Sequence, residues 1–305
     1  MSEVESKPVT PADCALLLAI PLDRESFLAD LSNPTKDFVR HFKLDGRANQ
    51  TNESVWEAYL PYATLATEVC KEVKGLGVQV ALSATLKDLH RLVAKWEVVT
   101  LVAHWRSALF RAEDIKSLDQ VKNLLVEKGI LSKDEMTKHN DSNSLAKHLN
   151  LILQTKDERF DDVLENSPGE AAAKQLKWHV RRHELEQHLG NSVVGGAGVE
   201  FADAFRDLQS IVTGFPVEFS GVLDLTVCQS VVLGEEVRIR CKGSQPLASV
   251  GKTSFDFRLA LYAQVINLLA QTPMAYEEAV LKTRKALIKR YGRKNRANKK
   301  LTRRS

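Results

Sequence analysis

The chain has 305 residues, of which 44% are hydrophobic and 27% are charged, a composition typical of globular domains and unlike disordered or fibrous chains. No apolar run approaches the ~20 residues of a membrane-spanning helix, and the polar, acidic start MSEVESKPVTPAD is unlike a signal peptide. The four cysteines form no CxxC pair, so we expect reduced thiols in a cytoplasmic protein.

Basic charge is concentrated at the carboxyl end. Twelve of the 43 Lys and Arg lie in residues 280–305, which contain no Asp or Glu, leaving 31 basic against 39 acidic residues in the rest of the chain. We expect 291–305 to be a disordered tail. It either keeps the protein soluble or contacts nucleic acid, an anionic membrane or an acidic protein.

Strands and helices alternate in the first part of the chain. Apolar runs at 14–20, 78–82 and 98–103 predict buried strands, and residues 52–73 and 86–95 have the helical period. This order of elements indicates a parallel sheet covered by helices. We therefore expect an α/β fold with a mostly parallel sheet and helices on both faces.

The next stretch has a different character. Residues 116–190 are polar and mostly helical by period, and GNSVVGGAG at 190–198 follows them as a flexible joint. We expect 116–190 to be a helical insertion packed beside the sheet, within a single domain that spans 1–305.

After the joint, further elements complete the predicted sheet. We expect a helix at 199–212, strands at 220–227 and 236–241, and helices at 255–270 and 274–290. The last two helices are expected to close the domain.

Two of the apolar strands end in residues suited to cysteine catalysis. VVTLVAH at 98–104 ends in His104, and SGVLDLTVC at 220–228 ends in Cys228. If these strands are neighbours, both residues lie at the carboxyl edge of the sheet, where open parallel sheets bind ligands. A thiolate is the nucleophile in such a site, and a nearby imidazole lowers the thiol pKa and protonates the leaving amine. We expect the imidazole and the sulfur within ~7 Å of each other.

These strand ends carry a family resemblance. VVTLVAHWRS at 98–107, FSGVLDLTVCQSVVLGE at 219–235 and TSFDFRLALYAQVINLLAQTPMAYEEAV at 253–280 resemble the CHAT family of prokaryotic caspase-like cysteine peptidases. The resemblance covers roughly 14–112 and 198–290. Each motif is short, and their order at strand ends makes the pair more specific.

The resemblance implies a caspase-like fold and a cysteine endopeptidase with one or few protein substrates, often in prokaryotic immunity or programmed death. It implies His104 as general base, Cys228 as nucleophile, and backbone N–H groups of Trp105 and Cys228 that hold the oxyanion. No metal or organic cofactor is implied. The implied partners are a protein substrate, such as a pore-forming protein encoded nearby, and an activating sensor or effector.

The sequence departs from the family at one position beside the histidine. The family usually has Gly there, whereas this chain has Trp105, which we expect to narrow the cleft. This departure and the long insertion leave a second interpretation open. In it, the chain is a catalytically degenerate caspase-like module that acts as a protein-binding, regulatory partner.

Three charged residues are weaker candidates for a substrate pocket. Asp224 shares a strand face with the expected nucleophile and would favour a basic substrate side chain, or it is a buried structural carboxylate. Asp256 is a candidate from the resemblance, and Arg106 would suit an acidic side chain. His179 and His183 are four residues apart on one predicted helix, but a solvated helix face is the simpler interpretation, and we expect no metal site.

Overall fold

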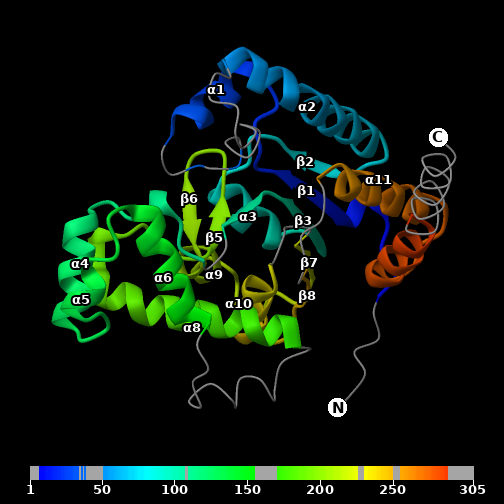
Figure 1. Ribbon diagram of the computed structural model, residues 1–305. Helices are drawn as coiled ribbons and strands as arrows, with labels where there is room; N and C mark the ends of the chain where they lie inside the picture. Colours follow the sequence, from blue (N-terminus) through cyan, green and yellow to red (C-terminus); the bar gives the residue numbers. More distant parts are fainter. Residues whose placement is uncertain are drawn as a thin grey trace, which may run out of the picture.

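The computed structural model describes residues 7–33, 36, 38, 51–106, 109–154, 170–225, 230–249 and 255–287. Its main feature is a 5-stranded sheet in the order β2-β1-β3-β7-β8 (Figure 1). The strands are β1 (Cys14–Leu18), β2 (Gln79–Ala81), β3 (Val98–Val102), β7 (Val222–Asp224) and β8 (Gln245–Leu247). Every neighbouring pair is parallel. The prediction of an α/β fold with a parallel sheet is confirmed.

The central strands are almost entirely apolar because both faces of the sheet are covered. All residues of β1 and β3 are buried, as is typical of strands inside a parallel sheet. Alternate side chains enter different cores: Ala15 and Leu17 pack on one face, and Leu16 and Leu18 pack on the other.

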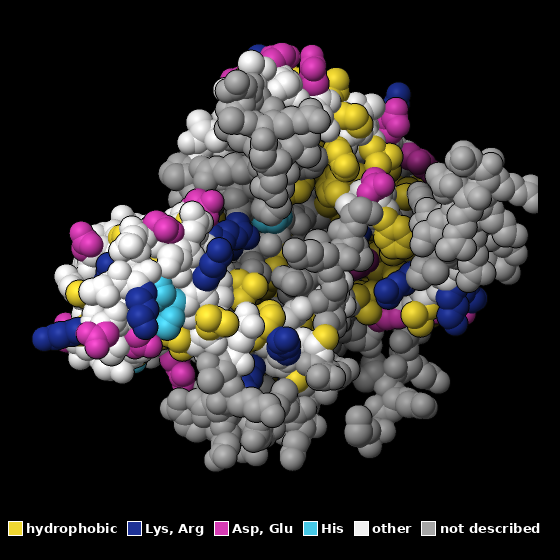
Figure 2. All heavy atoms as spheres, in the orientation of Figure 1, with side chains coloured by type: hydrophobic (Ala, Val, Ile, Leu, Met, Phe, Trp, Pro, Cys, Tyr) yellow, Lys and Arg dark blue, Asp and Glu magenta, His cyan; other side chains and the backbone are white. Residues whose placement is uncertain are grey.

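Helices cover both faces. The face that carries Leu16 and Leu18 is covered by α2 (Asn52–Gly75), α11 (Phe255–Gln271) and a helix at 276–287. The opposite face is covered by α3 (Leu86–Val93), α9 (Leu208–Thr213) and α10 (Val231–Arg240). A short helix, α1 (Arg24–Ser32), packs against α2. The rings of Tyr62 and Phe255 lie 6.2 Å apart, between α2 and α11. Hydrophobic side chains reach the surface on this side of the molecule (Figure 2).

A second, antiparallel sheet begins where β3 ends. It has the order β4-β5-β6, with β4 (His104–Arg106), β5 (Gly198–Glu200) and β6 (Phe205–Asp207). Only Ala103 separates β3 from β4, so the chain runs out of the large sheet directly into the small one.

The described residues between β4 and β5 are mostly helical. The helices are α4 (Leu118–Glu127), α5 (Lys133–Met136), α6 (Ser142–Gln154) and α8 (Glu170–Leu189), with single 3-10 turns at Ala112–Asp114 and Gly190–Ser192. Their apolar side chains form a hydrophobic cluster separate from those of the sheet. In the part of 116–190 that the structure describes, no residue belongs to a strand. None of the helices in the described part of the chain has the length and apolar character needed to cross a membrane.

Residues 236–241, predicted as a strand, belong mostly to α10. The alternation in EVRIRC suggested an extended chain, but Leu233 and Val237 are buried four residues apart along one side of a helix. Glu235 and Arg238 form an i,i+3 ion pair away from that side. The edge strand that pairs with β7 is instead β8, which begins a few residues later.

The predicted helix at 199–212 is also mostly wrong, because its first half forms β5 and β6. Gly198 explains this difference: a Cβ on it would lie 2.1 Å from the Arg206 backbone oxygen and 2.7 Å from the Phe205 ring. The missing side chain therefore allows β6 to fold back closely against β5. Only the end of the predicted helix survives, as α9.

Candidate active site

The candidate site depends on the pairing of β3 with β7. These strands are neighbours and parallel, with Val98 opposite Val222 and Thr100 opposite Asp224. Their carboxyl ends therefore lie at the same edge of the sheet. His104 follows β3 after one intervening residue. Cys228 comes four residues after the end of β7 in the sequence and lies outside the described residues, so its predicted distance from His104 stays a prediction.

His104 is half-buried on the first position of β4. Its Nε2 atom is buried, and its ring lies 5.4 Å from the ring of Phe38. The residue opposite His104 on β5 is Glu200. Side chains of directly opposed residues in an antiparallel pair point to the same face of the sheet, so an imidazole and a carboxylate share this face.

Glu200 is a residue that the sequence analysis missed. Its side chain is 3% exposed, and its Oε2 atom accepts a hydrogen bond of 3.1 Å from the backbone N–H of Phe38. Burial raises the pKa of this carboxyl group to about 7, against the opposing effect of the Phe38 N–H and of Arg106 and Arg111. No local pattern marked Glu200, because only the strand register brings it opposite His104.

Trp105 does not narrow a cleft beside His104, contrary to the expectation from sequence. Its side chain is buried in the cluster that includes Val199 and Leu101. Neighbouring residues of a strand point to opposite faces, so the indole lies on the face away from the His104 side chain. Trp105 therefore contributes to the core, and only its backbone is left for the predicted oxyanion role.

Arg106 is buried instead of facing solvent. Its Nη2 atom donates a hydrogen bond of 2.8 Å to Asp114 Oδ1, and its side chain is 2% exposed. The guanidinium lies 5.0 Å from the centre of the Phe205 ring. The opposite oxygen of Asp114 lies 3.3 Å from Nη1 of Arg182 on α8. Arg106 is thus part of a buried ion-pair network that joins β4 to the helical stretch.

The other candidates for a substrate pocket, Asp224 and Asp256, have surroundings different from those of His104. Asp224 is buried, and its Oδ2 atom accepts a hydrogen bond of 2.7 Å from the Tyr276 hydroxyl. Burial raises the pKa of Asp224 to about 6. Asp256 is exposed in the first turn of α11. The substrate roles of Asp224, Asp256 and Arg106 stay predictions.

The described cysteines are poor candidates for a reactive thiolate. Cys14, Cys70 and Cys241 are all buried. Burial raises the pKa of Cys14 to about 12 and that of Cys70 to about 11, and it also raises the pKa of Cys241. A thiol with a raised pKa is almost entirely protonated at neutral pH and reacts slowly.

Two histidines of α8, His179 and His183, differ in their surroundings. Burial lowers the pKa of His179 to about 4, and the Nε2 atom of His183 lies 3.3 Å from the Gln187 amide. Among the residues that the structure describes, no group of three His, Cys, Asp or Glu could hold a metal ion. His179 and His183 line a pocket of about 550 Å³ between α8 and the start of α9.

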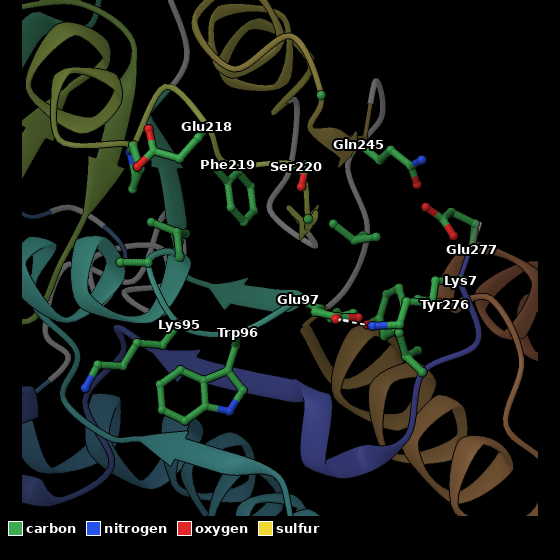
Figure 3. A pocket seen from close by; sticks show the side chains of 18 residues that line it. Lys7, Lys95, Trp96, Glu97, Glu218, Phe219, Ser220, Gln245, Tyr276 and Glu277 are labelled. Carbon is green, nitrogen blue, oxygen red and sulfur yellow. Dashed lines mark hydrogen bonds and ion pairs between the residues drawn. The ribbon is translucent and has the colours of Figure 1, made fainter. Parts of the chain in front are cut away.

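A pocket of about 590 Å³ lies at the amino ends of strands of the large sheet, whereas the candidate site lies at their carboxyl ends (Figure 3). Its walls come from the residues that begin β3, β7 and β8, and the carboxylates of Glu97, Glu218 and Glu277 line it. The Lys7 ammonium lies 2.7 Å from Glu97 (Figure 3). Since catalytic groups of parallel sheets gather beyond the carboxyl ends of strands, this pocket is separate from the candidate site.

Comparisons of the chain with protein-family models, with curated proteins and with solved structures gave no match.

Proposed function

We propose that the chain is a cysteine endopeptidase with a caspase-like fold, in which His104 is the general base and Cys228 the nucleophile. The observation that carries the proposal is the parallel register of β3 and β7, with Thr100 opposite Asp224. The chain leaves both strands at the same edge of the sheet. A histidine shortly after β3 and a cysteine shortly after β7 can therefore lie close together.

The proposed reaction proceeds through an acyl-enzyme. His104 takes the proton of the Cys228 thiol, and the thiolate attacks the carbonyl carbon of the scissile peptide bond. The backbone N–H groups of Trp105 and Cys228 donate hydrogen bonds to the oxyanion. The imidazolium of His104 then protonates the leaving amine, and water hydrolyses the thioester with His104 again as base. His104 accepts or donates the proton in each of these steps.

The surroundings of the other thiols support the assignment of Cys228 as the nucleophile. The pKa values of Cys14, Cys70 and Cys241 are raised by burial, so each has little thiolate at neutral pH. The proposed substrate is a protein, and a cytoplasmic role in prokaryotic defence or cell death fits a peptidase with few substrates.

A non-catalytic regulatory module is the second candidate function. The helices between β4 and β5 have their own hydrophobic cluster and, with the start of α9, a pocket of about 550 Å³. In a partner-binding role, these helices would form the binding surface. His104 and Cys228 would then not act together.

Alkylation by iodoacetamide, with mass-spectrometric mapping of each cysteine, distinguishes the peptidase from the non-catalytic regulatory module. We expect Cys228 to react fastest at pH 7 and His104→Ala to slow its reaction about tenfold or more. The matched control is His188→Ala, since His188 is exposed on α8. Equal rates for wild type and His104→Ala would contradict the peptidase proposal.

A further inference from the structure

We propose that Glu200 is the positioning residue for His104, an inference that rests on the proposed role of His104 as general base. The first observation is the strand register. His104 and Glu200 are Cα partners across the antiparallel pair β4–β5. Opposed residues of such a pair have Cβ atoms ~4.5–5.5 Å apart and side chains on one face, so the carboxylate is within reach of the imidazole.

The second observation is that one residue contacts both side chains. The Phe38 backbone N–H donates a hydrogen bond of 3.1 Å to Glu200 Oε2, and the Phe38 ring lies 5.4 Å from the His104 ring. Phe38 therefore restrains the carboxylate through its backbone and the imidazole through its side chain. A general base needs this kind of support, because a freely rotating imidazole spends little time in the reactive orientation.

The charges around Glu200 come from several elements. Arg106 of β4 and Arg111 attract the carboxylate, whereas Asp30 of α1 repels it. The Lys36 ammonium lies 2.6 Å from Asp30 and partly offsets that repulsion. His104 is the titratable residue directly opposite Glu200 in the strand register.

Burial raises the pKa of Glu200 to about 7, which places its titration in the pH range of an imidazole. Above that pH the carboxylate is ionised and stabilises the imidazolium form of His104. Below it the carboxyl group is neutral and this stabilisation is lost. Since an imidazolium also stabilises a neighbouring thiolate, Glu200 would make the His104–Cys228 pair more reactive above neutral pH than below it.

Nuclear magnetic resonance titration of the His104 imidazole tests the inference without any substrate. The His104 signal is assigned by its loss in His104→Ala. We expect Glu200→Gln to lower the pKa of His104 by about 0.5–1 unit, equivalent to a three- to tenfold change in proton affinity, and Glu200→Asp to retain part of the effect. The matched control is Glu236→Gln, because Glu236 also has a pKa raised by burial but lies on α10.

The alkylation rate of Cys228 gives a second readout. Relative to Glu236→Gln, we expect Glu200→Gln to react about three- to tenfold more slowly at pH 8 and at a similar rate at pH 5.5. Circular dichroism checks that each variant is folded. If Glu200→Gln fails to fold, Glu200→Asp decides, since its shorter side chain moves the carboxylate away from the imidazole and must change the His104 pKa.

The possible failures are separable. If His104→Ala does not slow alkylation, the proposed function is wrong, whatever Glu200 does. If His104→Ala slows alkylation but the Glu200 variants match Glu236→Gln in both readouts, the peptidase proposal stands and the role of Glu200 is refuted.

Discussion

The Tyr276 hydroxyl donates a 2.7 Å hydrogen bond to Asp224 Oδ2, and the Thr100 hydroxyl lies 3.2 Å from the same phenol oxygen. These three groups are buried between the sheet and the helix at 276–287. The contact joins the last described helix to the central strands β3 and β7.

This contact predicts a pH dependence of stability. The pKa of Asp224 is raised from 3.8 to about 6 by burial, so the folded chain binds this proton more tightly than the unfolded chain. The contribution of Asp224 to stability is therefore most favourable below pH ~4 and falls by about 3 kcal/mol as the pH rises to ~6. Asp224→Asn should remove this fall.

Urea unfolding of wild type and Asp224→Asn between pH 3.5 and 7 measures the effect. The difference between the two unfolding free energies isolates Asp224, because Glu200 and other groups titrate in both proteins. Tyr276→Phe should lose about 1 kcal/mol and should enlarge the fall in stability with pH, because the Tyr276 hydrogen bond lowers the pKa of Asp224. A pH-independent difference between wild type and Asp224→Asn would show that Asp224 is not the responsible group.

Asp114 is predicted to be essential for folding at ordinary temperatures. It is fully buried and faces Arg106 at 2.8 Å and Arg182 at 3.3 Å. Asp114→Asn takes the carboxylate away from the buried Arg106 guanidinium and removes one of the two carboxylates beside Arg182, which keeps Glu186 at 2.6 Å. This loss should cost about 3–5 kcal/mol. Thermal melts should show a large loss for this variant. The adjacent change Glu113→Gln is the control, since Glu113 is exposed and should change stability by less than about 0.5 kcal/mol.

Gly198→Ala is predicted to disrupt the small sheet. The added Cβ would lie 2.1 Å from the Arg206 backbone oxygen, and a backbone atom cannot move aside as a side-chain end can. The strands β5 and β6 would have to separate, at a cost of about 1–3 kcal/mol or more. Gly195→Ala, where the Cβ would meet nothing within 4 Å, should leave the melting temperature unchanged. Equal melting temperatures of the two variants would contradict the close packing of β6 on Gly198.

The proposed dyad predicts non-additive mutations. Cys228→Ala and His104→Ala should each abolish cleavage of a cognate protein or a selected peptide. Because both residues act in one step, the double variant should be no slower than the single variants. Quantitative turnover of the three variants, with His188→Ala as control, gives the comparison. Full activity of Cys228→Ala would leave the binding-module interpretation.

Some elements could be predicted because their burial is visible in the sequence itself. β1 and β3 lie inside a parallel sheet with both faces covered, so nearly all of their residues are apolar. α11 was equally clear, since its long apolar stretch occupies the interior face of the fold. By contrast, α10 was predicted as a strand, because a six-residue alternation does not distinguish a strand from a helix whose one buried side is short.

The sequence by itself determined the class of fold and the places of β1, β2, β3 and β7 along the chain, and it marked His104 and Cys228 as the ends of two apolar runs. The tertiary structure alone decided which side chains face each other. Glu200 lies opposite His104 only through the register of β4 and β5, and Arg106, Asp114 and Arg182 meet from three separate elements. Apolar burial is a property of each segment and leaves a local pattern, whereas the pairing of isolated charges depends on the distances between segments that only folding sets.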